Sequence, residues 1–300
     1  MTPDIAEHIR TASGFIFDMD GTIALGDAAS GGHKALPHAI DLLADIKARG
    51  IPLRVFTNGT AKPPAVYAAS LRSAGFALED HEMMTPSSSA AVWFVRQGIK
   101  RVRVLGTEGV MQPLRAAGID VIGPSEQASG VEAVYTGWFR DFTFPDLEAA
   151  CGDIWAGAML TTASHVPFFA TASGRGIGSS FAINKMIMAM TSAKLRVLGK
   201  PSRTAFSAAC RSMGLHGATR KRVIIVGDDP ALEMRMARDV GVIGIGMTTG
   251  LMKPEAVAAL KASERPHATS NSLHTLRDAF RPIDSVQSWC RGYDKCGDPS

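Results

Sequence analysis

The chain has few cysteines, no long run of like charges and no long apolar segment. Its four cysteines, Cys151, Cys210, Cys290 and Cys296, form no Cys-x-x-Cys pair. This argues against a zinc site, and four are too few for a disulfide scaffold. The chain has no run of five or more basic residues, so nothing in it indicates a nucleic-acid arm. Because no signal peptide or apolar run of roughly 20 residues is present, we expect a cytoplasmic protein with no nucleic-acid or membrane partner.

The overall composition of the chain is that of an ordinary globular protein. The 300 residues are 46% hydrophobic and 20% charged, and this length suits one or two domains. The net charge of +4 is small for the size of the chain, but a weakly positive field favours anionic small molecules as ligands. The sequence leaves the oligomeric state open, and a homodimer is one of the assemblies it allows.

Short apolar segments alternate with amphipathic segments in both outer parts of the chain. The expected strands are 14–17, 53–56, 223–226 and 242–247, and the expected helices are 36–49, 64–74, 202–213 and 231–240. This alternation is typical of a parallel sheet with helices on both faces. We therefore expect an α/β protein whose core is a doubly wound parallel sheet.

The middle of the chain shows the same alternation on a smaller scale. The expected strands are 102–105, 133–136 and 158–162, the expected helices are 87–97, 109–117, 145–156 and 181–190, and a loop rich in Gly and Ser is expected at 172–180. We expect a core of residues 1–86 and 194–280, with a smaller α/β domain inserted at 87–193. Residues 281–300 are polar and lack periodicity, as in a mobile or loosely docked tail.

Two polar motifs follow expected strands in the first part of the chain. Asp18-Met19-Asp20-Gly21-Thr22 follows 14–17 and brings two carboxylates to one strand end. Taken alone, it fits an Asp-Gly turn equally well. Thr57-Asn58-Gly59-Thr60 follows 53–56, where a hydroxyl and successive N–H groups can form an anion pocket. Taken alone, an ordinary Asn-Gly turn is the simpler interpretation.

Two further motifs lie in the last third of the chain. Gly199-Lys200-Pro201 precedes the helix at 202–213, and Lys200 can neutralise phosphate oxygens or is simply a surface lysine. Gly227-Asp228-Asp229-Pro230 follows 223–226, with Glu233 nearby. Magnesium usually takes one or two carboxylates together with phosphate oxygens, whereas Asp at a helix start can also be an N-cap. Whether Asp229 or Glu233 supports a metal site stays open.

In this order and context, the four motifs resemble those of the haloacid dehalogenase superfamily of phosphotransferases, over roughly residues 12–280. Asp-x-Asp-Gly-Thr after an apolar strand is the most specific of them. The resemblance implies a Rossmann-like core with Asp18 as nucleophile and Asp20 as general acid and base. It also implies a phosphate site and a Mg²⁺ site. The phosphate site would be Thr57, Asn58, Gly59 and Lys200, and the metal site would be Asp18, Asp20 and Asp228.

The spacing of the motifs selects a branch of the superfamily. The residues between Asp20 and Thr57 are too few for a domain, whereas the middle α/β unit fits between Thr57 and Lys200. A cap inserted there is similar to the class IIA branch, which includes p-nitrophenyl, pyridoxal phosphate and sugar-phosphate phosphatases. That branch often has Asp or Asn in the segments matching 137–139 and 161–164. Here those residues are apolar or small, so no branch substrate is carried over.

The resemblance predicts a Mg²⁺-dependent phosphomonoester hydrolase that forms an aspartyl phosphate on Asp18 and acts on a small phosphorylated metabolite. A phosphotransferase or mutase keeps every motif and stays an alternative. A non-catalytic phospho-ligand-binding module predicts damage to at least one motif, and all are intact. Specificity is expected from the inserted domain, with Phe139 and Arg175 as candidates. Equally, Phe139 can be core and Arg175 can lie in a flexible hinge.

Overall fold

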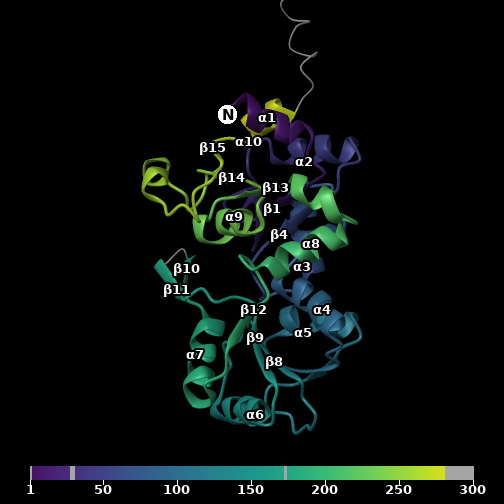
Figure 1. Ribbon diagram of the computed structural model, residues 1–300, viewed down its shortest axis with the longest axis vertical. Coiled ribbons are helices and arrows are strands. Elements are labelled where there is room, and N and C mark those ends of the chain that lie inside the picture. The colour runs from purple at the N-terminus through teal and green to yellow at the C-terminus, as the bar shows by residue number, and fades with distance from the viewer. Residues whose placement is uncertain (1, 28–30, 172–173, 281–300) are drawn as a thin grey trace, which may run out of the picture.

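The computed structural model describes residues 2–27, 31–171 and 174–280, and its larger sheet combines two distant parts of the chain (Figure 1). Its six strands are parallel and run in the order β15-β14-β13-β1-β4-β5. They are β1 (Gly14–Phe17), β4 (Leu53–Phe56), β5 (Met83–Met84), β13 (Val223–Gly227), β14 (Ile243–Met247) and β15 (Ala268–Ser270). The chain goes from β1 to one side through β4 and returns on the other through β13. The strand order therefore reverses between β1 and β13, and ligands bind at such a point in open α/β sheets.

Continuous apolar strands explain why this sheet lies inside the protein. Every residue of β1, β4 and β13 is buried, as expected for parallel strands covered on both faces. One face packs on α1 (Pro3–Arg10), α2 (Ala39–Ala48), α3 (Pro64–Ser73) and α10 (Leu273–Phe280). The other face packs on α8 (Arg203–Ser212) and α9 (Arg235–Val240). The two clusters form the core that fixes the strand ends.

A smaller parallel sheet forms the lower part of the molecule in Figure 1. Its order is β12-β9-β8-β6-β7, made of β6 (Arg101–Leu105), β7 (Asp120–Ile122), β8 (Ala133–Thr136), β9 (Met159–Thr162) and β12 (Leu195–Val197). One face packs on α4 (Pro86–Gln97) and α5 (Glu108–Ala116), the other on α6 (Phe144–Trp155) and α7 (Ser179–Thr191). The expected α/β fold class is confirmed. The smaller sheet extends to Val197, beyond the expected boundary at residue 193.

Two antiparallel hairpins were not expected from the sequence. β2 (Ala24–Asp27) pairs with β3 (Gly32–Ala35), and β10 (Phe168–Thr171) pairs with β11 (Gly174–Ile177). The expected loop at 172–180 is therefore wrong for 174–177. Glycine at two of the four positions of β11 removes the side-chain alternation that marks a strand, while pairing with β10 supplies its backbone hydrogen bonds.

The expected helix at 231–240 is also divided. A π-helical segment, η3 (Pro230–Met234), comes first and α9 follows it. Single π-helical turns are rare and occur frequently at functional sites. The expected tail at 281–300, with Cys290 and Cys296, lies outside the described residues. Over the described part of the chain, the structure has no helix of the length and apolar character that a membrane span needs.

Candidate active site

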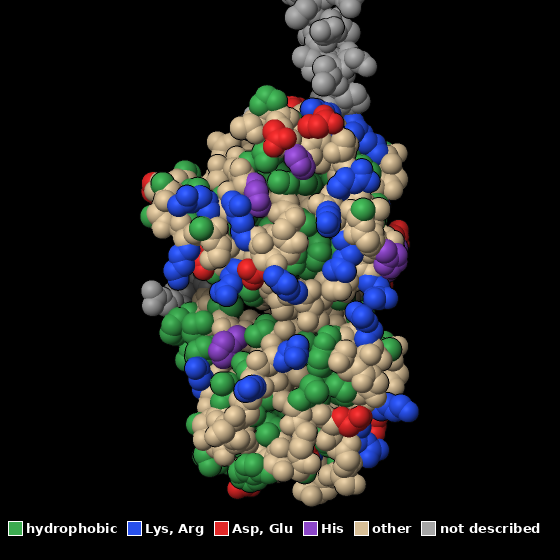
Figure 2. Space-filling model, viewed as in Figure 1, with side chains coloured by type: hydrophobic (Ala, Val, Ile, Leu, Met, Phe, Trp, Pro, Cys, Tyr) green, Lys and Arg blue, Asp and Glu red, His purple; other side chains and the backbone are tan. Residues whose placement is uncertain are grey.

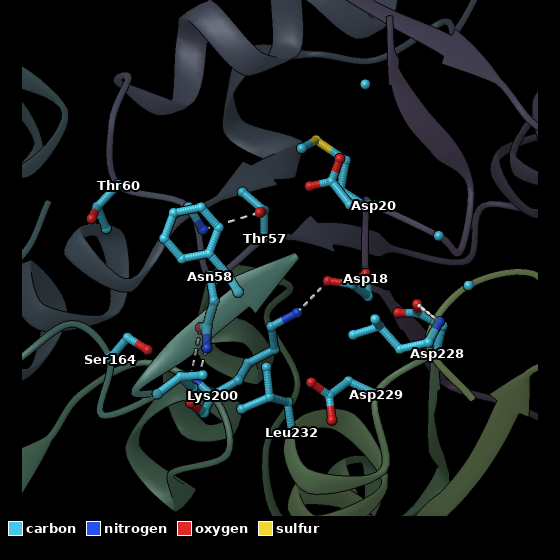
Figure 3. A pocket seen from close by; sticks show the side chains of 18 of the residues that line it. Asp18, Asp20, Thr57, Asn58, Thr60, Ser164, Lys200, Asp228, Asp229 and Leu232 are labelled. Atoms are coloured by element: carbon cyan, nitrogen blue, oxygen red, sulfur yellow. Dashed lines mark hydrogen bonds and ion pairs between the residues drawn. The ribbon is translucent and has the colours of Figure 1, made fainter. Parts of the chain in front are cut away.

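A cavity of about 810 Å³ lies where the carboxyl ends of both sheets meet (Figure 3). The larger unit contributes segments that follow β1, β4, β13 and β14, and the smaller unit contributes segments that follow β8 and β9. Seven residues expected from the sequence line it, namely Asp18, Asp20, Thr57, Asn58, Gly59, Lys200 and Asp228. Asp229 and Glu233 line it as well. The four motifs, distant in sequence, are thus brought together.

Lys200 lies at the bottom of this site and is 1% exposed. Its Nζ donates to Asp18 Oδ1 at 2.5 Å and to the carbonyl oxygen of Phe56 at 2.6 Å, and it lies 2.5 Å from Glu233 Oε1. Burial alone would lower the pKa of Lys200, but the charges of Asp18 and Glu233 outweigh it and raise the pKa. Lys200 is therefore a buried cation beside the expected nucleophile, and the surface-lysine alternative is wrong.

The Asn58 side chain holds the segment that carries Lys200. Its Nδ2 donates to the carbonyl oxygen of Lys200 at 3.2 Å, and its Oδ1 accepts from the Lys200 backbone N–H at 3.1 Å. Nearby, Thr57 Oγ1 accepts from the backbone N–H of Gly59 at 3.1 Å. The Asn58 amide thus joins the segments that follow β4 and β12. Phosphate binding by the turn after β4 stays a prediction.

Carboxylates are crowded on the opposite side of Asp18. The pKa of Asp228 is raised to about 7 and that of Asp20 to about 6. In both cases burial is the main cause and the negative charge of Asp18 the next. Asp228 Oδ2 accepts from the Leu251 N–H at 2.7 Å, which fixes the carboxylate. A cation bound between these groups would offset the charge of Asp18, which is the second cause of both shifts after burial.

Asp228 and Asp229 have different roles in the structure. Asp229 Oδ1 accepts from the Ala231 N–H at 2.8 Å and so caps η3. Asp228 lies against two glycines, and a Cβ at Gly21 or Gly250 would overlap its Oδ2. By position, Asp229 caps η3, whereas Asp228 lies near Asp18. Which of the two binds a metal ion stays a prediction. The carboxylate of Glu233 forms an ion pair with the ammonium of Lys200.

Magnesium fits this set of oxygen atoms without a dense carboxylate cluster. In the described ranges, the structure has no group of three or more His, Cys, Asp or Glu side chains arranged to hold a metal ion. The expected ligands are the carboxylates of Asp18 and Asp228 with the backbone carbonyl of Asp20, and they need no such cluster. Mg²⁺ usually keeps several waters and takes one or two carboxylates plus substrate phosphate. Asp18 and Asp228, with a backbone carbonyl such as that of Asp20, meet this requirement.

A histidine that the sequence did not single out lies beside Asp20. His33 Nε2, from β3, is 3.8 Å from Asp20 Oδ1, and His33 Nδ1 lies 2.8 Å from Ser70 Oγ on α3. The pKa of His33 is lowered by burial and by the charge of Lys62. The hairpin β2–β3 thus places a polar ring next to the expected acid and base. No signal in the sequence marked it, because the hairpin itself was not expected.

The structure places the side chain of one of the two expected specificity residues, Phe139, but not that of the other, Arg175. Phe139 packs against Phe142, with ring centroids 6.2 Å apart, within a hydrophobic cluster of the smaller unit. It does not appear among the described residues that line the cavity, whereas its neighbour Trp138 does. Phe139 thus fits the core alternative. Arg175 is paired with Ala170 in β11, and its side chain lies outside the described residues.

Comparison with known proteins identifies the class to which this fold and site belong. Models of a haloacid dehalogenase-like hydrolase and of a HAD-hydrolase-like family match residues 15–120 and 197–276. Mouse chronophin is 25% identical over 92% of this chain and 96% of its own. A 4-nitrophenylphosphatase structure from Thermotoga maritima has a TM-score of 0.79, with 23% identity over 91% of this chain and 99% of its own. A glycerol phosphate phosphatase from Mycobacterium tuberculosis, in complex with magnesium, has a TM-score of 0.76 and 22% identity over 90% of this chain and 77% of its own.

The chain belongs to the haloacid dehalogenase-like hydrolases. Its relatives are phosphatases of the class IIA branch, so the resemblance carried by the motifs is confirmed. The structural neighbours show the same α/β fold over nearly the whole chain. The family assignment agrees with the cavity, where a buried cation, a strand-end turn and several carboxylates converge on one point.

Proposed function

We propose that the protein is a Mg²⁺-dependent phosphomonoester hydrolase that acts on a small phosphate ester through an aspartyl phosphate on Asp18. One observation carries the proposal. Asp18 and Asp228 follow the adjacent parallel strands β1 and β13, and the buried ammonium of Lys200 holds one oxygen of Asp18 at 2.5 Å. A fixed, ionised carboxylate at the strand-order reversal suits covalent catalysis.

The chemistry follows from the positions of these side chains. With Oδ1 held by Lys200, Asp18 attacks phosphorus through its other oxygen as the ester oxygen departs. Lys200 and the turn at Thr57 and Gly59 stabilise charge on the transferring group, because phosphoryl transfer depends mainly on positioning and electrostatics. Asp20 gives its proton to the leaving oxygen. It then takes a proton from the water that releases phosphate from Asp18.

Magnesium, when bound, spreads the negative charge of the phosphoryl group and orients it. Asp18, Asp228 and the backbone carbonyl of Asp20 are the groups that would hold it. The grouping of buried carboxylates supports this assignment, since burial and then the negative charge of Asp18 raise the pKa values of Asp20 and Asp228. The magnesium complex of the Mycobacterium tuberculosis glycerol phosphate phosphatase lends it further support.

We also propose that the core is formed by 1–86 and the segment after Val197, and that the inserted unit is a cap. Trp138 and Ser164 reach the cavity from this unit, and the Trp138 N–H donates to Thr60 Oγ1 at 3.0 Å. A cap over the site can exclude water and contact the leaving group. The relatives named for glycerol phosphate and 4-nitrophenyl phosphate support a small ester as substrate.

The test is phosphate release by the purified full chain from a panel of phosphomonoesters with Mg²⁺ present. We expect release from at least one ester, and a phosphorylated protein after acid quench during turnover. The same panel with added alcohols separates a hydrolase from a phosphotransferase, because the latter passes phosphate to the alcohol. Binding of esters without release of phosphate or transfer to alcohol would support the non-catalytic alternative and refute the proposal.

A further inference from the structure

The side of the cavity formed by the smaller unit is aromatic. Trp138, from the segment after β8, and Phe169, from β10, line the cavity with ring centroids 5.6 Å apart and planes at 67°. Phe168 and Val166 lie in the same lining. We call these four residues the aromatic wall. Edge-to-face packing of this kind fixes the two rings relative to each other.

The two phenylalanines of this wall are partly exposed. Phe168 is 52% exposed and Phe169 is 40% exposed. Figure 2 shows apolar side chains gathered where the hairpin β10–β11 lies, at the junction of the two units. On the side of the larger unit, Leu25 and Leu251 also line the cavity and are exposed. Apolar groups on both sides of a cavity indicate a ligand that covers them.

Two serine hydroxyls on this side already have partners within the protein. Ser179 Oγ accepts from the Phe139 N–H at 3.2 Å, and Ser180 Oγ donates to the Ser164 carbonyl oxygen at 3.1 Å. Among the described residues, the smaller unit contributes no charged side chain to the lining. A leaving group rich in hydroxyls would lose water here and find few hydrogen-bonding groups on this side in exchange, which is unfavourable.

We propose that the substrate is a phosphomonoester whose leaving alcohol carries a planar aromatic ring, with Trp138 and Phe169 selecting it. The inference rests on the proposed hydrolase activity, because it names the leaving group of that same site. The phosphoryl group lies among Asp18, Lys200 and Thr57, and the ring lies against the aromatic wall. Burial of an aromatic ring and ring–ring contact favour such a substrate over a polyol phosphate.

Three esters of primary alcohols test the class of leaving group. Benzyl phosphate, cyclohexylmethyl phosphate and glycerol 3-phosphate all release a primary alkoxide, so differences in kcat/KM report mainly on contacts with the rest of the alcohol. We expect benzyl phosphate to exceed glycerol 3-phosphate by about 10-fold or more. It should also exceed the non-planar cyclohexylmethyl ester. Equal or better turnover of glycerol 3-phosphate, or equal turnover of the two ring compounds, would overturn the proposal.

Single substitutions test the two residues. Trp138→Ala and Phe169→Ala should reduce the ratio of kcat/KM for benzyl over glycerol phosphate by about 10-fold, and Trp138→Phe should retain more of this ratio. The matched controls are Trp155→Ala and Phe144→Ala on α6, which are 66% and 75% exposed and lie outside the cavity lining. The controls should keep the wild-type ratio. An unchanged ratio in both wall variants would refute the role of the wall.

Calorimetry with phosphonates separates this inference from the proposed activity. Benzylphosphonate cannot be hydrolysed, and we expect it to bind the full chain with Mg²⁺ more tightly than methylphosphonate. If no ester is turned over but this preference is found, the hydrolase proposal fails while the aromatic wall stands. If esters are turned over but the two phosphonates bind equally, the activity stands and the inference fails.

Discussion

The ammonium of Lys200 lies 2.5 Å from a carboxylate oxygen of Asp18 and 2.5 Å from one of Glu233. Lys200 lies just before α8, Asp18 directly follows β1, and Glu233 lies in the π-helical segment η3. Glu233 is buried, which raises its pKa, while the charge of Lys200 acts in the opposite direction. Glu233 and Asp18 thus hold the Lys200 ammonium between them.

Glu233→Gln tests this arrangement because it keeps the shape of the side chain and removes the charge. Breaking a buried ion pair costs about 3–5 kcal/mol, so we expect a lower free energy of unfolding in urea. With Lys200 less firmly placed, kcat should fall by about 10-fold or more. Glu255→Gln, at an exposed position, is the control. Wild-type stability and kcat in Glu233→Gln would show that Lys200 needs no second partner.

Asp18→Asn should eliminate turnover of every ester, because an amide is not a useful nucleophile. Acid quench followed by mass measurement should show no phosphorylated protein, whereas the wild type should show it during turnover. The folded state should persist, as judged by circular dichroism. Appreciable activity in a preparation free of other phosphatases would contradict the covalent mechanism.

Asp20→Asn should have an effect that depends on the leaving group. General acid–base help is typically worth roughly 10²–10⁴-fold, and an alkoxide needs this help more than a phenolate. We expect a large loss of kcat for alkyl phosphates and a smaller loss in the first step for activated aryl phosphates. Single-turnover rates on both substrates measure this first step. Equal losses on the two would assign Asp20 to structure or metal binding instead.

Removal of divalent metal should abolish phosphate release, and added Mg²⁺ should restore it. The reason is the grouping of carboxylates around Asp18 in a buried site, where burial and then the charge of Asp18 raise the pKa of Asp228 and of Asp20. The measurement is the phosphate release rate after dialysis against chelator and again after titration with Mg²⁺. Full activity in excess chelator would refute the metal assignment.

The central strands of the larger sheet could be predicted from the sequence residue by residue. β1 and β4 match the expected 14–17 and 53–56, because continuous apolar segments end at strong turn signals. The order of the motifs placed Asp18, Thr57, Lys200 and Asp228 correctly in one cavity. Helix starts were less certain, and α2 begins at Ala39 because His38 adopts a left-handed backbone with φ of 65°.

Contacts between distant side chains could not be predicted in the same way. Glu233 was noted only as a carboxylate near Asp228 whose part in a metal site was open, since nothing local shows that it reaches Lys200. His33 and Phe169 lie on hairpins whose strands lack clear alternation. Trp138 and Phe139 are adjacent, and the chain leaves β8 just before them. Pattern alone therefore could not show that Trp138 faces the cavity while Phe139 packs against Phe142.

Gly250→Ala provides a local test of the position of Asp228. A Cβ at Gly250 would overlap Asp228 Oδ2, the oxygen that accepts from the Leu251 N–H. Gly250 is not among the glycines with positive φ, so alanine is compatible with its backbone and the clash with Asp228 is the main effect. Gly21→Ala would combine the same clash with backbone strain, because Gly21 has a φ of 78°.

We expect Gly250→Ala to raise the Mg²⁺ concentration for half-maximal activity by about 10-fold or more, since displaced neighbours of a metal site typically cost about 10- to 100-fold in affinity. The control is Gly152→Ala in α6, where a Cβ would have no heavy atom within 4 Å. That variant should keep the wild-type Mg²⁺ dependence and fold. If Gly250→Ala is folded and its Mg²⁺ titration matches the wild type, Asp228 can move without loss. It would then not be the carboxylate that holds the metal.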